Sequence, residues 1–288
     1  MNEEEQAVFR AVAAAEEKLA FAAQKVADAY LAGGRTVYVG AGTSGRIAFS
    51  DAAEMPPTFG VDPDRFVAVM AGGLFAVEQA HEDVEDDEHA AIEAINGLQL
   101  GRSDVLIGLA ASGKTPFVLA AVRHAREKGV WTCGICNSRN GPLLSVCDHP
   151  ILIETGAEVL TGSTRLKAGT AQKLALNRIS TAAMVLAGKV VENLMVDVKA
   201  KNKKLQERCV RIVRELQPVS AADEIRDDHV VAAPTRAGIA VVVEDAPGVH
   251  LPEQLHVRHR RRRTWTLEQF VEEAQGRCSV IPQYAAVC

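Results

Sequence analysis

The stretch VYVGAGTSGRIAF, Val37 to Phe49, decides the fold, because it reads as a strand running into a glycine-rich loop and then a helix. The loop, Gly40 to Gly45, has the G-x-G-x-x-G pattern of dinucleotide sites. Such a site also needs a carboxylate near the end of the next strand to hold ribose hydroxyls. The next strand, FVAVM at 66–70, runs into alanine and glycines instead. The loop offers two hydroxyls, Thr43 and Ser44, beside the free N–H groups of a helix start, which suits a phosphate monoester.

A second loop of similar chemistry follows the strand-like segment VLIGLA at 105–110. It reads ASGKTP, and it places Ser112, Gly113, Lys114 and Thr115 at the start of another helix. Loops that follow neighbouring strands of an open α/β sheet converge where ligands bind. The two hydroxyl-rich loops together therefore predict a phosphate site, and the glycine pattern is not interpreted as a dinucleotide fingerprint.

Strand-like and helix-like segments alternate along the chain, which is typical of a parallel sheet covered by helices on both faces. We therefore predict a doubly wound three-layer α/β sandwich with a five-stranded parallel sheet. The expected strands are 36–40, 66–70, 105–110, 130–136 and 150–155, and the expected helices are 3–32, 44–56, 74–94, 116–128 and a long stretch from about 167 to 216. The expected domains are an N-terminal helix at 1–34, the sandwich with long C-terminal helices at 35–216, and a divergent tail at 217–288.

The composition is that of a folded soluble protein, with 48% apolar and 24% charged residues, and it argues against disorder. The net charge of −5 gives no bias toward nucleic acid or an anionic membrane. The acidic start MNEEEQ and the lack of an apolar run of about 18 residues predict a cytoplasmic protein with no nucleic-acid or membrane partner. The basic run 256–263 lacks interleaved aromatic residues, so we interpret it as a solvated tail.

Cys133 and Cys136 have the C-x-x-C spacing of redox and zinc sites, but they lie inside the strand-like segment VWTCGIC. Redox pairs usually sit where a strand gives way to a helix, and no second metal-binding pair follows. We interpret both residues as small apolar side chains of a buried strand, and we predict no metal site.

Carboxylates that could act as an acid or a base occur in two places. Glu54 comes just before two prolines near the end of the first loop's helix. Glu78, Glu82 and Glu85 lie at helical spacing in the acidic segment VEQAHEDVEDDEH, where crowded like charges raise carboxyl pKa values. An exposed acidic helix explains these residues equally well, and sequence chemistry alone does not choose among them.

Four long motifs resemble one known family: GAGTSGRIAFSDAAEMPPTFG (40–60), ASGKTP (111–116), GAEVLTGSTRLKAGTAQKLALNRIST (156–181) and GKVVENLMVDVKAKNKKLQERCVRIV (188–213). The family is that of the N-acetylmuramic acid 6-phosphate etherases, which have the sugar isomerase (SIS) fold. The resemblance covers about residues 3–215. It implies a lyase that cleaves the C3 lactyl ether of this phosphorylated amino sugar by elimination and water addition, giving N-acetylglucosamine 6-phosphate and D-lactate. It further implies a homodimer without metal or organic cofactor.

The resemblance also assigns roles. Glu54 falls on the family's acid, which protonates the departing lactate, and Glu85 falls on its base, which acts at C2 and in water addition. Lys114 stands where the family usually has arginine, so it keeps the charge but loses the bidentate fork. The implied substrate-binding residues are Gly42, Thr43, Ser44, Ser112, Gly113, Lys114 and Thr115, with Ser163, Thr164 and Lys167 as further candidates.

Three other interpretations remain open from the sequence. The chain could be a non-catalytic phosphosugar-binding regulator resembling the glucokinase regulatory protein. It could be an aldose–ketose isomerase of the same fold, which would share the phosphate loops but lack the D-A-x-E-x-P-P-T motif. Its divergent ends could also have left an inactive member of the etherase family.

Overall fold

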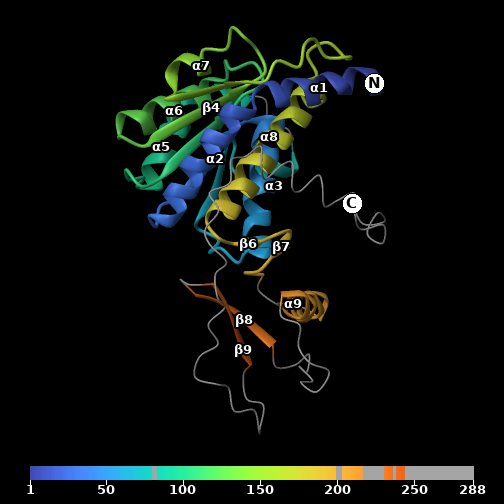
Figure 1. The fold of residues 1–288 in the computed structure, drawn as a ribbon. Coiled ribbons are helices and arrows are strands. Elements are labelled where there is room, and N and C mark those ends of the chain that lie inside the picture. Colours follow the sequence, from blue (N-terminus) through green and yellow to red (C-terminus); the bar gives the residue numbers. More distant parts are fainter. Residues whose placement is uncertain (80–82, 199–202, 217–229, 236–237, 244–288) are drawn as a thin grey trace. The chain divides into compact units, whose positions relative to one another are not determined.

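The computed structural model describes residues 1–79, 83–198, 203–216, 230–235 and 238–243 (Figure 1). The chain divides into two compact units, Met1–Lys189 and Val190–Cys288. The basic run 256–263 and Glu82 lie outside the described residues, as does most of the expected tail. No helix within the described ranges is long and apolar enough to cross a membrane.

The first unit is built on a five-stranded parallel sheet in the order β2-β1-β3-β4-β5, as predicted. Its strands are β1 Thr36–Gly40, β2 Phe66–Met70, β3 Val105–Leu109, β4 Trp131–Cys136 and β5 His149–Leu152. The chain goes from β1 outward to β2 and then returns to the other side of β1 with β3. The loops after β1 and β3 are therefore neighbours at the point where the strand order reverses, which is where open α/β sheets bind ligands.

Helices cover both faces of this sheet, as a fully buried parallel sheet requires. The helices of this unit are α1 Asn2–Ala14, α2 Glu16–Leu31, α3 Gly42–Phe59, α4 Phe75–Glu78, the 3-10 helix η1 Asp83–Asp86, α5 Glu88–Gly97, α6 Pro116–Glu127, α7 Leu143–Val146 and α8 Lys167–Leu186. Figure 1 shows α5 and α6 on one side of the sheet, with α2, α3 and α8 on the other. The central strands β1 and β3 are buried along their whole length.

Two expected helices are broken. The N-terminal helix ends at Ala14 and restarts at Glu16, because Ala15 adopts φ −97° and ψ 5°. The acidic segment 74–94 is not one helix, since its described parts are α4, η1 and α5, and Asp87 caps α5 by accepting from Ala90 N at 2.9 Å. The interpretation that Glu78 and Glu85 share a helix face was therefore wrong.

The long helical stretch expected from about 167 is also interrupted. Helix α8 ends at Leu186, before Gly188 with φ +78°. The second unit begins there with the hairpin strands β6 Val190–Val191 and β7 Leu194–Met195, followed by α9 Lys203–Leu216. Its remaining described elements are the antiparallel strands β8 Val230–Thr235 and β9 Gly238–Val243.

Candidate active site

The first loop closes tightly between β1 and α3. Ala41 is extended and Gly42 has φ +52°, so the chain turns sharply into the helix. A Cβ on Gly40 would come within 2.6 Å of Gly45 N, and one on Gly45 would come within 2.7 Å of Met70 Cγ on the edge strand. Glycine is required because the backbone folds onto itself and onto β2. The start of α3, whose first N–H groups have no partner within the helix, is thereby held at the carboxyl edge of the sheet.

The carboxylate of Glu85 lies over this loop. Its Oε1 is 2.9 Å from the position that a Cβ on Gly42 would take. The neighbouring Val84 packs against the hydrophobic core, and its Cγ2 would lie 3.1 Å from a Cβ on Gly72, just after β2. The structure thus brings one of the two implied catalytic carboxyls to the first loop.

Arg46, in the first turns of α3, holds the segment that leads to Glu85. Its Nε donates to Val77 O at 3.0 Å, and its Nη2 donates to Ala76 O at 2.8 Å. These carbonyls belong to the last turn of the short helix α4, where backbone acceptors have no intrahelical donor. A planar guanidinium holds both in a fixed fork geometry, which the flexible ammonium of a lysine does not provide.

The chain that follows β4 packs against the second loop. Gly113 has φ +67°, and a Cβ there would come within 2.7 Å of Gly141 Cα. The Gly113 carbonyl accepts from Leu143 N at 3.0 Å. The Ser112 hydroxyl accepts from Lys114 N at 3.1 Å, which leaves its own O–H free to donate. Ser112 and Lys114 are exposed and Thr115 precedes α6, so this loop also presents a helix start toward the first loop.

Helix α8 contacts the first loop through a glycine. A Cβ on Gly169 would meet Thr43 Cγ2 at 3.3 Å and Thr164 O at 3.5 Å. Thr43 and Thr164, both predicted to bind substrate, are therefore close together. Ser163 precedes Thr164 in the same turn, where its backbone N–H donates to Leu160 O at 2.9 Å.

The start of α8 is occupied by charged groups of the chain itself. Both carboxylate oxygens of Glu158 accept from backbone N–H groups, those of Lys167 and Ala168, at 3.0 Å each. The Lys167 side chain is 4% exposed, and its Nζ pairs with Glu4 of α1 at 2.5 Å. Lys167 is thus engaged with α1, and the sequence analysis did not anticipate either partner.

A pair of amide side chains, the buried Gln172 and the half-buried Asn137, links α8 to the second loop, and sequence reasoning missed it. Asn137 donates its backbone N–H to Ala111 O at 2.9 Å and its Nδ2 to Ile153 O at 2.9 Å. Its Oδ1 must then face Gln172, and it accepts from Gln172 Nε2 at 3.2 Å. Gln172 is fully buried, and its Oε1 has no hydrogen-bond partner within the described part of the chain. A glutamine on the buried, small-residue face of α8 was the signal available in the sequence.

Glu54, the other implied catalytic carboxyl, lies away from the first loop. It is exposed, and it comes twelve residues after Gly42 on the continuous helix α3, which is about 18 Å along the axis at 1.5 Å per residue. One turn earlier, the buried Asp51 accepts from Tyr38 Oη at 3.0 Å and from Ser180 Oγ at 3.3 Å. Burial raises the pKa of Asp51, although Lys173 and the two hydroxyls act in the opposite direction. This network fixes the second half of α3 against β1 and α8.

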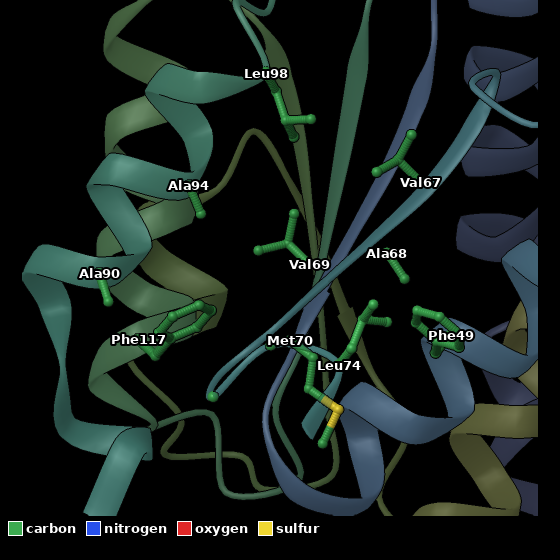
Figure 2. A pocket seen from close by; sticks show the side chains of 12 residues that line it. Phe49, Val67, Ala68, Val69, Met70, Leu74, Ala90, Ala94, Leu98 and Phe117 are labelled. Carbon is green, nitrogen blue, oxygen red and sulfur yellow. The ribbon is translucent and has the colours of Figure 1, made fainter. Parts of the chain in front are cut away.

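An apolar cavity of about 500 Å³ opens beside the edge strand β2, away from the hydroxyls of the two loops. Figure 2 shows Val69 on the same side of the strand as Ala94 and Phe117, while Phe49 and Ala68 lie together on the other side. The residues that line the cavity include no charged side chain, so the cavity has no charged group that could bind a phosphate.

Cys133 and Cys136 lie fully buried within β4, as the strand interpretation predicted. Burial raises the pKa of both thiols. Across the described residues, no group of three or more His, Cys, Asp or Glu side chains is arranged to hold a metal ion.

Comparison with known proteins places these features in a family. A sequence model of the glucokinase regulatory protein N-terminal SIS domain matches residues 18–126. A phosphoheptose isomerase structure from Francisella tularensis shares the fold, with a TM-score of 0.50 and 17% identity over 64% of this chain and 94% of that one.

Sequence relatives are much closer. The N-acetylmuramic acid 6-phosphate etherase of Geobacillus thermodenitrificans is 45% identical over 255 residues, which cover 88% of this chain and 86% of that protein. The etherase of Deinococcus radiodurans is 51% identical over 205 residues, which cover 71% of this chain and 67% of that protein. The chain therefore belongs to the N-acetylmuramic acid 6-phosphate etherase family.

Proposed function

We propose that this chain is a carbon–oxygen lyase that cleaves the lactyl ether of N-acetylmuramic acid 6-phosphate. The products are N-acetylglucosamine 6-phosphate and D-lactate. The observation that carries the proposal is the Glu85 carboxylate, with its Oε1 2.9 Å from the Cβ position of Gly42 in the first loop. A carboxylate directly beside a helix start that favours anions suits a base acting on a phosphosugar held there.

The two loops would share the phosphate. The starts of α3 and α6 supply backbone N–H groups, and Thr43, Ser44, Ser112 and Thr115 supply hydroxyls. These loops follow neighbouring strands β1 and β3, so one monoester can contact both. Gly42 and Gly113 let the backbone approach the oxygens, and the exposed Lys114 adds positive charge. Ser163 and Thr164 would then contact the sugar and its lactyl group, whereas the buried Lys167 is paired with Glu4.

The chemistry follows from the ring-opened sugar, in which the C1 aldehyde acidifies the C2 proton. Glu85 removes that proton while Glu54 protonates the ether oxygen on C3, and the C3–O bond breaks to release lactate. Water then adds its oxygen to C3 of the unsaturated aldehyde, and C2 regains a proton. One water molecule is consumed in total. General acid–base catalysis of this kind contributes about 10²–10⁴-fold per group.

The protein would act as a homodimer in the cytoplasm. Among the residues that the structure describes, Cys133, Cys136, Cys147 and Cys209 are free thiols, as is usual in a reducing compartment. We expect the reaction to need no cofactor, because the two carboxyls can supply the acid and the base.

The test is D-lactate release from N-acetylmuramate 6-phosphate by the purified chain in ¹⁸O-labelled water. The label should enter the amino sugar at C3 and not the lactate, because the C3–O bond is the one broken. Unphosphorylated N-acetylmuramate is the matched control, and it should react poorly because the loops lose their anion. Label in the lactate would rule out cleavage at C3.

The match to the glucokinase regulatory protein domain favours a second candidate, a non-catalytic phosphosugar-binding protein. That match covers residues 18–126 only, whereas the etherase relatives extend over most of the chain. A folded protein that binds the phosphosugar in calorimetry and releases no lactate would establish this alternative.

A further inference from the structure

The proposed substrate carries two anionic groups, a phosphate on C6 and the carboxylate of the lactyl group on C3. The starts of α3 and α6 account for the phosphate. The lactyl carboxylate is only a few bonds from the C2 proton that Glu85 removes, so it has to lie near the Glu85 carboxylate beside the first loop. Two carboxylates at close range repel each other. The site therefore needs a positively charged side chain for the lactyl carboxylate.

The segments that follow strands β1, β4 and β5 each carry a cation that is engaged within the chain. Arg46 donates to two backbone carbonyls of α4. Arg139 pairs with Glu154 through two hydrogen bonds, at 3.2 and 2.6 Å. Lys167 is buried and paired with Glu4. Each of these cations would have to give up its present partners in order to bind a substrate.

Arg165 differs from these three cations. It is exposed, and its side chain has no hydrogen bond or ion pair with any residue that the structure describes. The preceding residue is Thr164, whose carbonyl accepts from Gly169 N at 2.9 Å. A Cβ on Gly169 would lie 3.5 Å from that carbonyl and 3.3 Å from Thr43 Cγ2 in the first loop. The backbone that leads into Arg165 is therefore packed close to the first loop.

We propose that Arg165 binds the lactyl carboxylate and so selects substrates that carry this group. This inference rests on the proposed function. A planar guanidinium can donate two parallel N–H bonds to the two oxygens of a carboxylate, which fixes the orientation of the lactyl group. The nearby backbone N–H groups of Lys167 and Ala168 cannot take this role, because they already donate to Glu158. Lys114, exposed in the second loop, remains for the phosphate.

The experiment compares two phosphosugars that differ only by the lactyl group. The full-length Glu85→Gln variant, which should bind without turnover, is titrated in a calorimeter with N-acetylmuramate 6-phosphate and with N-acetylglucosamine 6-phosphate. Adding Arg165→Gln should weaken binding of the first sugar about 10- to 100-fold and of the second less than about twofold, because only the first carries a carboxylate. Retained binding of the second sugar also shows that the variant is folded.

Three further variants serve as matched controls. Arg178→Gln removes the same charge from an exposed arginine about 16 Å along α8 from its first residue, and it should leave binding of both sugars unchanged. Lys114→Gln should weaken both sugars by the same factor, since both carry the phosphate. Arg165→Lys should keep part of the preference for the lactyl sugar, because it retains the charge without the fork.

The kinetics of the otherwise wild-type chain give a second readout. Arg165→Gln should raise KM for lactate release about 10- to 100-fold and change kcat less than about threefold, because the carboxylate is bound in the ground state and in the transition state alike. Equal weakening of the two sugars by Arg165→Gln, or no weakening of either, would overturn the inference. A wild-type chain that binds both sugars and releases no lactate would refute the proposed function instead, and the ratio of the two dissociation constants would still decide the role of Arg165.

Discussion

Replacing Gly42 by alanine tests whether Glu85 acts from its position over the first loop. The new Cβ would lie 2.9 Å from Glu85 Oε1, whereas ordinary contacts begin at 3.4 Å. The carboxylate would therefore have to move by about 0.5 Å, which is the tolerance within which a catalytic group must be held. A misplacement of about 1 Å costs about 100-fold in rate. We expect Gly42→Ala to lower kcat/KM for lactate release by tens of fold.

The same substitution also strains the backbone, and a control separates the two effects. Gly42 has φ +52°, so alanine there costs about 1–2 kcal/mol of stability. Gly33, with φ +84°, has no neighbour within 4 Å of its Cβ position. Gly33→Ala should lower the Tm by a similar few degrees and leave kcat/KM unchanged. The reasoning fails if Gly42→Ala, at a matched Tm, is as active as Gly33→Ala.

Three further substitutions have defined outcomes. Arg46→Lys should lower kcat for lactate release about tenfold, because a flexible ammonium lacks the planar fork that holds the two carbonyls of α4. An unchanged kcat would contradict this role. Gln172→Met removes the buried Oε1, whose lack of a hydrogen-bond partner costs the fold about 1–3 kcal/mol. It also removes the hydrogen bond from Nε2 to Asn137, which stabilises the fold by about 1 kcal/mol. Its Tm in calorimetry should therefore be equal or higher, and a marked fall would be inconsistent with an unpaired oxygen. Burial alone would raise the pKa of Asp104, but hydrogen bonds from Arg35 and backbone N–H groups lower it overall. The stabilisation is therefore complete above about pH 4 and is lost as the pH falls through the lowered pKa of the folded state. Asp104→Asn should lose most stability in urea unfolding at pH 7 and progressively less below pH 4, and an equal loss at pH 7 and at about pH 2 would refute the sign.

The sequence was sufficient for the sheet and for the positions of the two glycine-containing loops, because both depend on local patterns. Apolar segments such as TVYVG are bounded by glycines, and the fully buried strand β1 coincides with that segment. Hydroxyls and glycines next to helix starts identified the loops after β1 and β3, and the strand order made them neighbours.

The site was less predictable where it depends on long-range packing. The acidic segment has helical spacing, yet packing of Val84 at Gly72 turns η1 so that Glu85 reaches the first loop. Helix α3 also continues through two prolines to Phe59, beyond its expected end at residue 56. The break at Ala15 has no proline or glycine to indicate it. Gln172 pairs with a residue 35 positions away, which no local pattern shows.

The capping of α8 by Glu158 has an electrostatic consequence for anion selectivity. Three helices begin near the site, and each carries roughly half a positive charge at its start. At α8 that charge is already neutralised by a carboxylate of the same chain, held at 3.0 Å by two N–H groups. The starts of α3 and α6 follow the neighbouring strands β1 and β3, and the Glu85 carboxylate lies beside the first of them. Free inorganic phosphate should therefore compete with the phosphate of the substrate at that point and leave the start of α8 unoccupied.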